Sequence, residues 1–449
     1  MLCALSAPLC VICAFLVLCL LIFLAVSWYE SSKVEIPSGV ANPNLPRRIH
    51  TFSTGAFILG KALDKLGVGN VTDTFNYLQK ISVPKPKDDP EIFTKDLQFG
   101  GVLRVYHPRS HSAHGRKGVL FFHGSGFLLA SIDFMWKLFL YEVVYERISL
   151  YILSPLETPC TLRCKRPRRS KLATIWAPPP SPLISAEDFA SFLKQMIDNI
   201  RYRLAPKHKC PAALDDCVLA TVHFLTMAEE LGVDPSSVII CGDSAGSNLT
   251  AGVCQALVGR SNVPKPLAQV MIYPAVQMAD FNLPSYQQNK MVPLLLREDA
   301  LYYSLTYIGG DLSLSKEMMK GSHVPPEVRQ KLSKWLSSEE FKVKGYKPHI
   351  MAPFNKDVYE KVRKVLDGPC SPLFSDDALI RQLPQAYILT CEFDVLRDDG
   401  ILYKKRLEDN GVPVTWYHVK NGYHGVISFF DQPDGVAEKL AMDNVITYN

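Results

Sequence analysis

A serine between two glycines is the clearest chemical signal in this chain. The motif G-D-S-A-G follows a β-branched apolar run at residues 238–241 and precedes apolar residues at helical spacing. A strand, a tight turn and a helix in this order hold a serine hydroxyl above the edge of a sheet, where it can attack a carbonyl carbon. Ordinary βα turns also contain this pattern, so its chemistry depends on partners elsewhere. The motif predicts Ser244 as the nucleophile, supported by Gly242, Asp243 and Gly246.

Two further polar residues follow predicted strands and complete a candidate triad. Asp394 comes after the strand expected at 386–390, and His424 comes after the strand expected at 414–419. Because parallel strands end at one edge of a sheet, both side chains are expected beside Ser244. Their order along the chain is that of α/β-hydrolases. His424 would take the serine proton, and Asp394 would fix the imidazole tautomer and stabilise the imidazolium.

A glycine-rich loop supplies the expected oxyanion donors. The sequence H-G-S-G-F follows a short apolar strand expected at 118–122. Consecutive backbone N–H groups in such a loop can bind the oxygen that becomes negative during acyl transfer. A further N–H lies at the start of the helix after the nucleophile. The predicted oxyanion hole consists of His123, Gly124, Ser125 and Ala245, with the N–H groups of the last three as donors.

The alternation of strands and helices predicts the fold class. The chain has 449 residues, 47% of them hydrophobic and 21% charged, which are ordinary values for a globular protein. We expect an α/β-hydrolase fold with a mostly parallel central sheet, helices on both faces and a helical cap. Residues 30–95 would form a linker and N-terminal cap helices (49–66 and 72–79). Residues 96–449 would form the catalytic domain, with a hairpin at 96–106 and a cap insertion at 285–365.

The N-terminus predicts a membrane anchor at residues 1–29. This segment has no acidic or basic side chain, and Leu9 to Val26 is almost wholly apolar. Such a run is long enough to cross a bilayer as one transmembrane helix, with Trp28 and Tyr29 at the interface. A cleaved signal peptide is the alternative, but its apolar core is usually only about 7–15 residues long. The basic residues after the span, which by themselves favour a cytosolic catalytic part, are Lys33, Arg47 and Arg48.

No motif in the chain indicates a metal or nucleic-acid site. The cysteines show neither a C-x-x-C pair nor metal-ligand spacing with histidine. The net charge of +5 is explained by six basic residues within 163–171, so it does not indicate a nucleic-acid surface. A glycosylation sequon places Asn70 as a modification site if it lies in the lumen of the endoplasmic reticulum. A second sequon begins at Asn248, on the nucleophile helix, where we expect it to be buried.

The motifs together support a family resemblance. The segments H-G-S-G-F, Y-R-L-A-P, G-D-S-A-G, E-F-D-V-L-R-D-D-G and Y-H-G occur in that order. With the N-terminal anchor, the chain resembles the arylacetamide deacetylase-like branch of the hormone-sensitive-lipase family. The resemblance implies a single-pass protein of the endoplasmic reticulum (microsomal) membrane with a lumenal catalytic domain. It implies a serine hydrolase acting on carboxylic esters, arylacetamides or acylglycerols through an acyl-enzyme, without metal or organic cofactor.

The chain departs from the family pattern at three places. Ser125 replaces a glycine of the oxyanion loop, and Leu128 replaces a cysteine that family members pair with the equivalent of Cys391. That disulfide should therefore be absent. Residues 146–200 form an atypical polybasic, proline-rich insertion of the kind that is usually disordered. The insertion precedes Y-R-L-A-P, where the family has a central strand, and residues 148–153 (I-S-L-Y-I-L) are the candidate replacement.

These departures leave an alternative function open. A damaged oxyanion loop and an interrupted sheet would leave a lipid-binding or scaffold protein of the same fold, with impaired catalysis. The intact Ser, Asp and His order favours the enzyme.

Overall fold

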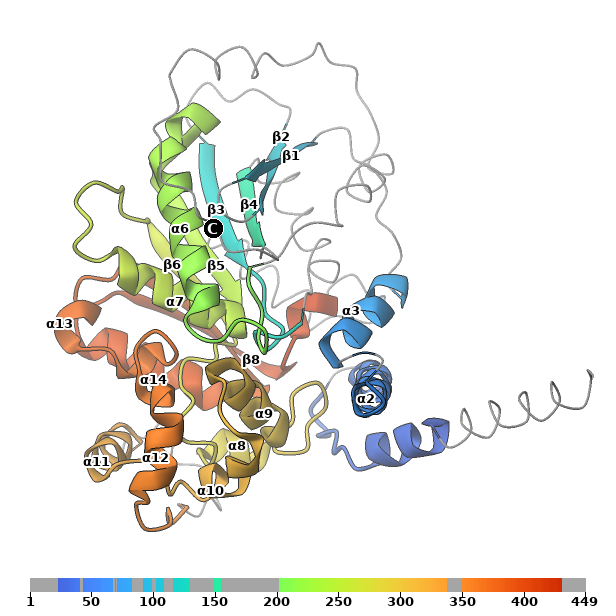
Figure 1. Cartoon of the computed structure of the whole chain (residues 1–449). Helices are drawn as coiled ribbons and strands as arrows, with labels where there is room; N and C mark the ends of the chain where they lie inside the picture. Colours follow the sequence, from blue (N-terminus) through green and yellow to red (C-terminus); the bar gives the residue numbers. More distant parts are fainter. Residues whose placement is uncertain are drawn as a thin grey trace, which may run out of the picture.

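The computed structural model describes residues 23–40, 43–67, 69, 71–82, 92–98, 102–108, 116–129, 149–154, 202–336 and 349–429. Within them the centre of the molecule is an eight-stranded sheet with the order β1-β2-β4-β3-β5-β6-β7-β8 (Figure 1). The strands are β1 Ile92–Gln98, β2 Val102–Pro108, β3 Arg116–Phe122, β4 Ser149–Ser154, β5 Val233–Asp243, β6 Ala268–Ile272, β7 Gln385–Phe393 and β8 Val414–Tyr423. Strands β1 and β2 form the expected antiparallel hairpin, and β3 to β8 pair in parallel.

The replacement strand predicted from the sequence is present. Strand β4 covers residues 149–153 of the predicted segment I-S-L-Y-I-L and lies between β2 and β3. It pairs antiparallel with β2 and parallel with β3, where Phe121 lies opposite Ile152. The sheet therefore continues without a gap from its antiparallel end to the central strands. The remainder of the predicted insertion, and the poor strand candidate at 195–201, lie outside the described residues.

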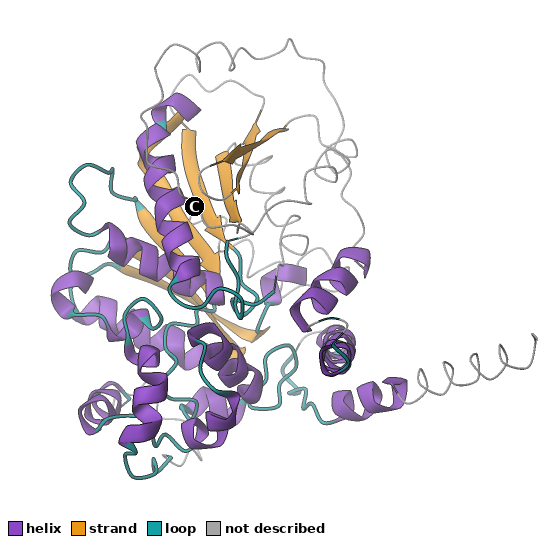
Figure 2. Ribbon diagram, in the orientation of Figure 1, coloured by secondary structure: helices purple, strands orange, loops and turns teal. Residues whose placement is uncertain are grey.

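Three helices cover one face of the sheet (Figure 2). The helix after the nucleophile, α7 Ala245–Leu257, packs on β3, β5 and β6, while α6 Ala212–Met227 packs beside it and α14 Arg397–Asp409 packs on β7 and β8. A hydrogen bond of 3.3 Å from Gln255 Nε2 to the Tyr403 hydroxyl joins α7 to α14. Apolar residues of β3, β5 and β6 beneath these helices are buried, and this packing fixes the positions of the strand ends. The helices expected on the second face remain a prediction.

A group of short helices lies beyond one end of the sheet, where the sequence predicted a cap insertion (Figure 1). They are α8 Pro284–Gln288, α9 Arg297–Ile308, α10 Ser315–Met319, α11 Pro326–Trp335 and α12 Lys356–Val362. The remaining short elements are η2 Glu229–Leu231, η3 Leu312–Leu314, η5 Arg363–Leu366, η6 Pro372–Phe374, α13 Asp377–Ile380 and η7 Val426–Phe429. Helix α9 packs against α10, and residues of α9 line the candidate site.

The N-terminal helices also reach the site. Helix α2 Asn44–Lys65 packs against α3 Val71–Ser82, close to the two helices expected from the sequence. Residues 23–32 form a further helix, whose Phe23 and Ser27 contact α2 at Gly55. The rest of the predicted anchor, residues 1–22, lies outside the described residues. Among the helices that are described, none has both the length and the apolar character needed to cross a bilayer.

One disulfide was not anticipated from the sequence. Cys210, just after Y-R-L-A-P, is bonded to Cys370, which precedes η6. The bond joins segments that are 160 residues apart, so it ties the start of α6 to the loop that packs beneath α7. Cys391 is buried and unpaired, as the leucine at position 128 predicted. Its thiol lies in the core, where burial raises its pKa well above the ordinary value.

Candidate active site

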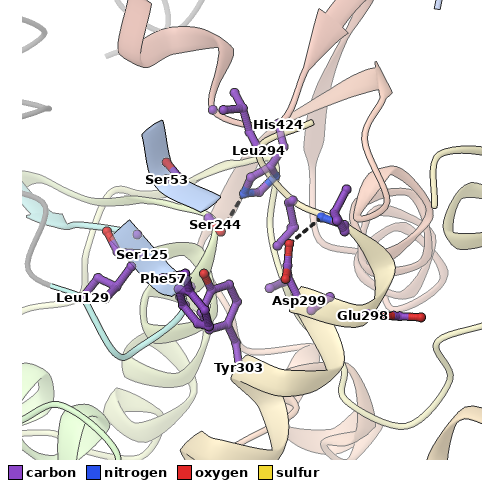
Figure 3. A pocket seen from close by; sticks show the side chains of 18 of the residues that line it. Ser53, Phe57, Ser125, Leu129, Ser244, Leu294, Glu298, Asp299, Tyr303 and His424 are labelled. Carbon is purple, nitrogen blue, oxygen red and sulfur yellow. Dashed lines mark hydrogen bonds between the residues drawn. The ribbon is translucent and has the colours of Figure 1, made fainter. Parts of the chain in front are cut away.

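The turn between β5 and α7 places Ser244 in a strained backbone conformation. Its φ of 52° and ψ of −118° lie in a region that residues with a Cβ rarely adopt. The turn is tight enough that a Cβ on Gly246 would collide with the carbonyl of Phe122 in β3. Glycine is therefore required there, as the G-x-S-x-G motif predicted. The serine side chain faces the cavity at the end of the sheet (Figure 3).

The structure brings together the three residues of the predicted triad. Ser244 Oγ lies 3.0 Å from His424 Nε2, and His424 Nδ1 lies 2.8 Å from Asp394 Oδ2. The three residues directly follow β5, β7 and β8, so the parallel strands deliver them to one edge of the sheet. Figure 3 shows the contact between Ser244 and His424. Asp394 is 1% exposed. This geometry allows the Ser244 hydroxyl to donate its proton to His424 as it attacks a carbonyl carbon.

Neighbouring groups hold the imidazole and the carboxylate in place. The N–H of Leu396 donates to Asp394 Oδ1 at 2.8 Å, so the second carboxylate oxygen is also hydrogen-bonded. Asn289 Nδ2 donates to the Asp394 carbonyl at 3.0 Å. The Tyr273 ring packs against His424 with the ring centroids 4.8 Å apart. Asn289 and Tyr273 carry no local sequence signal, because their roles depend on contacts between distant segments.

Gly124 does not serve as the free oxyanion donor that the sequence predicted. Its N–H donates to Asp243 Oδ1 at 2.6 Å, inside the turn that carries the nucleophile. Asp243 is buried, and burial raises the pKa of its carboxyl to about 6, although the Gly124 N–H opposes this shift. A Cβ on Gly124 would lie 2.6 Å from the same carboxylate. Gly124 therefore fixes the loop to the nucleophile turn, and its N–H is occupied in this structure.

The next residues of the loop present the remaining backbone donors. Ser125, Gly126 and Phe127 have consecutive positive φ values of 91°, 62° and 64°. Ser125, Gly126 and Ala245 all line the cavity beside Ser244. Ala245 is the first residue of α7, so its N–H has no acceptor within the helix. Gly126 was not predicted as a donor from the sequence, although its place in the same glycine loop could have indicated it.

His123 supports this loop and does not line the cavity. Its ring stacks on Tyr202 of Y-R-L-A-P, with the centroids 4.6 Å apart and the planes inclined by 17°. The Tyr202 hydroxyl donates to the His123 carbonyl at 3.0 Å, and the Ala205 N–H donates to the Phe127 carbonyl at 3.1 Å. The structure therefore places His123 as a residue that positions the oxyanion loop.

The triad opens into a cavity of about 660 Å³. Its walls come from the oxyanion loop, α2, α9 and the chain before α9, and they are mostly apolar, with Ile49, Phe57, Leu294, Leu295 and Tyr303 among them. The Leu294 N–H donates to His50 Nδ1 at 3.4 Å, and this bond connects the chain before α9 to α2. Burial lowers the pKa of His50 to about 4, so its ring is neutral at physiological pH. The cavity can accommodate an apolar molecule next to Ser244.

The two sequons have different outcomes. Asn70 lies outside the described residues. Asn248 is buried on α7, and its Nδ2 donates to the carbonyls of Ala275 at 2.7 Å and Cys370 at 2.9 Å. In the folded protein Asn248 is therefore a structural residue that a glycosyltransferase cannot reach, as the sequence predicted.

This sheet, the nucleophile turn and the cavity define an α/β-hydrolase. A family model described as an alpha/beta hydrolase fold matches residues 184–322 and 329–428. Human arylacetamide deacetylase-like 4 is 37% identical over 403 residues, which cover 89% of this chain and 87% of that protein. Mouse arylacetamide deacetylase-like 3 is 35% identical (88% and 86% covered), and mouse neutral cholesterol ester hydrolase 1 is 30% identical (89% and 90%). The chain belongs to the arylacetamide deacetylase-like branch of the hormone-sensitive-lipase family, and it is a serine hydrolase of the esterase type.

Solved structures support the fold. The Francisella virulence factor BioJ aligns with a TM-score of 0.56 at 19% identity, covering 94% of this chain and 97% of that one. A carboxyl esterase from the fungus Tuber melanosporum aligns with a TM-score of 0.52 at 18% identity, covering 81% and 90%. At such identities the likeness establishes the α/β-hydrolase architecture alone.

Proposed function

We propose that this protein hydrolyses carboxylic esters or arylacetamides, with acylglycerols as further substrates of the same chemistry, and that Ser244, His424 and Asp394 are its catalytic triad. The observation that carries the proposal is the pair of contacts at 3.0 Å and 2.8 Å that link the serine oxygen to the imidazole and the imidazole to the carboxylate. The names of the relatives, which include arylacetamide deacetylase and neutral cholesterol ester hydrolase, support these substrate classes.

The reaction follows from the positions of these groups. Ser244 Oγ attacks the carbonyl carbon while its proton passes to His424 Nε2, and Asp394 stabilises the resulting imidazolium. The carbonyl oxygen becomes negative and is bound by the N–H groups of Ser125, Gly126 and Ala245. His424 then gives the proton to the leaving alcohol or amine, which leaves an acyl-enzyme. A water molecule, deprotonated by His424, attacks that ester and releases the acid.

The cap accounts for the preference for apolar substrates. Residues 30–95 and 285–365 would act as the two parts of the cap, because α2 from the first and α9 from the second line the cavity next to Ser244. The apolar side chains that they contribute are suited to acyl or aryl groups. No metal or organic cofactor takes part in this mechanism.

The proposal includes a membrane anchor at residues 1–29 and a lumenal catalytic domain in the endoplasmic reticulum. The apolar run from Leu9 to Val26 supports the anchor, and the exposed fractions of Trp28 (71%) and Tyr29 (57%) suit a position at the bilayer interface. The Cys210–Cys370 disulfide supports the lumen, because disulfides persist in oxidising compartments. The disulfide is stronger support for a lumenal domain than the three basic residues after the span are for a cytosolic one.

A fluorophosphonate probe tests the catalytic assignment. The probe should label the wild-type protein, and Ser244→Ala should abolish both labelling and ester hydrolysis. Asp394→Asn should lower kcat by about 10⁴-fold, since the imidazole would lose its required tautomer. Ser236→Ala, at an exposed serine in the first half of β5, is the matched control and should label normally. Labelling that survives Ser244→Ala would exclude this serine as the nucleophile.

A second candidate function is lipid binding or scaffolding without efficient catalysis. The observation that favours it is the engagement of the Gly124 N–H by Asp243, which leaves the oxyanion hole without one expected donor. Losing one donor costs about 3–4 kcal/mol of transition-state stabilisation. This function predicts that the protein binds an apolar ester analogue without turning it over, and that Ser125→Gly restores turnover.

A further inference from the structure

Two polar side chains of α9 lie in the cavity wall beside apolar residues such as Phe57 and Leu295. Asp299 and Tyr303 are one helical turn apart, so they project from the same face of α9. Both line the cavity that contains Ser244, and Figure 3 shows them on the side of it opposite His424. The Tyr303 ring also packs against the oxyanion loop, where a Cβ on Gly126 would lie 2.7 Å from a ring carbon. The pair therefore lies within the substrate site.

These side chains retain hydrogen-bonding capacity that the described residues do not use. Asp299 Oδ2 accepts a hydrogen bond of 3.1 Å from the Leu296 N–H, which closes the first turn of α9. Within the described ranges no group donates to Asp299 Oδ1, and none pairs with the Tyr303 hydroxyl. Partly buried polar atoms of this kind are costly to leave unpaired, so a ligand that supplies their partners gains binding free energy.

The charge of Asp299 decides what kind of partner fits. Burial raises the pKa of this carboxyl to about 6, while the Leu296 N–H and the positive charge of Lys61 on α2 oppose the shift and Glu298 adds to it. The carboxyl is therefore mostly ionised at neutral pH and accepts hydrogen bonds without donating them. Burial also raises the pKa of Tyr303, so its hydroxyl keeps its proton and can donate or accept.

We infer that Asp299 and Tyr303 form a polar subsite for a hydroxyl or ammonium group on the part of the substrate remote from the scissile carbonyl. This inference rests on the proposed function and specifies its substrates: apolar esters or amides that carry one hydrogen-bond donor at a distance from the reacting bond. Asp299 Oδ1 accepts the donor's proton, and the Tyr303 hydroxyl donates to its lone pair when the group is a hydroxyl. An unsubstituted alkyl chain leaves both protein groups unpaired.

The test compares matched substrates on the full-length protein. One series contains p-nitrophenyl esters of straight-chain acids whose terminal group is methyl, hydroxyl or ammonium, at equal chain length and over several lengths. A second series contains acetates of the corresponding alcohols, which places the terminal group on the leaving side. The measured quantity is the ratio of kcat/KM for each polar ester to kcat/KM for its methyl counterpart. The series in which the ratio has a maximum shows which side of the scissile bond reaches the subsite.

At the length with the highest ratio, Asp299→Asn should lower that ratio by about tenfold, and Tyr303→Phe should lower the hydroxyl ratio by about fivefold. The change should appear in KM, because the contact is made equally in the ground and transition states. The amide introduced by Asp299→Asn keeps an acceptor for the Leu296 N–H, so the start of α9 is preserved. Tyr303→Phe removes no hydrogen bond within the described residues, so it tests the subsite even if the first variant folds poorly.

Glu327 provides the matched control. It is also an acidic residue in the first turn of a helix, but it is exposed on α11 and does not line the cavity, so Glu327→Gln should leave the hydroxyl ratio unchanged. Ratios that do not respond to Asp299→Asn or Tyr303→Phe at any length, in either series, overturn the subsite. An equal effect of Glu327→Gln also overturns it, since the effect would then not come from the cavity wall. Failure of the catalytic assignment is recognised separately, as fluorophosphonate labelling that survives Ser244→Ala.

Discussion

Replacing Ser125 by glycine tests whether the oxyanion loop is strained. Ser125 has a φ of 91°, and its side chain makes no hydrogen bond to the described residues. A residue with a Cβ in this region costs about 1–2 kcal/mol relative to glycine. Glycine in turn loses about 0.4–1 kcal/mol through the greater freedom of the unfolded chain. Ser125→Gly should therefore raise the free energy of unfolding by about 0.5–1 kcal/mol.

The assay is urea unfolding followed by circular dichroism, with the unfolding free energy extrapolated to water. Ser125→Ala is the control, because alanine keeps the Cβ and loses only the hydroxyl. It should stay within about 0.5 kcal/mol of the wild type. A glycine variant less stable than the wild type would refute the strain argument. Equal stabilisation by alanine and glycine would also refute it, since the gain would then come from removing the hydroxyl.

Three further changes test other parts of the site. Burial raises the pKa of Asp243 from 3.8 to about 6, so its protonated carboxyl stabilises the fold by about 3 kcal/mol below about pH 4, and this contribution is lost as the pH rises through 6. Urea titrations across this pH range should show the wild type losing about 3 kcal/mol of unfolding free energy relative to a non-titrating Asp243→Asn variant. Replacing both Cys210 and Cys370 by serine should lower the unfolding free energy by about 2–5 kcal/mol, and the difference should vanish when the wild type is measured with a reductant. Gly246→Ala forces a Cβ into the Phe122 carbonyl and should cost more than about 3 kcal/mol, seen as loss of the cooperative unfolding transition.

The parts of the site that could be predicted are those with a local sequence signal. The nucleophile turn is defined by a β-branched run, two glycines and a helical pattern, and the structure has β5, Ser244 and α7 at these positions. The replacement strand could be predicted because I-S-L-Y-I-L has the β-branched and aromatic composition of a strand, and β4 covers it.

Other features depend on which distant residues meet, and the sequence has no local signal for them. The acceptor for the Gly124 N–H is the carboxylate of Asp243, which the motif suggested only as a supporting residue. Cys210 and Cys370 are 160 residues apart and show no distinctive spacing. Asp299 has the sequence signature of an acidic residue in the first turn of a helix, a role it also fills. Its position in the cavity wall is evident only from the packing of α9.

The contact between Tyr202 and His123 has a consequence for how this protein could change over evolution. Strand β4 ends at Ser154 beside the carboxyl end of β3, and the described chain resumes at Tyr202, whose ring and hydroxyl are fixed to the first residue of the oxyanion loop. Both ends of this connection are therefore held near the carboxyl end of β3. Doubling the length of such a closed loop costs only about 0.6 kcal/mol of closure entropy. Insertions and deletions between these two points can accumulate without moving the catalytic groups, so this connection is the natural position for grafting a new module.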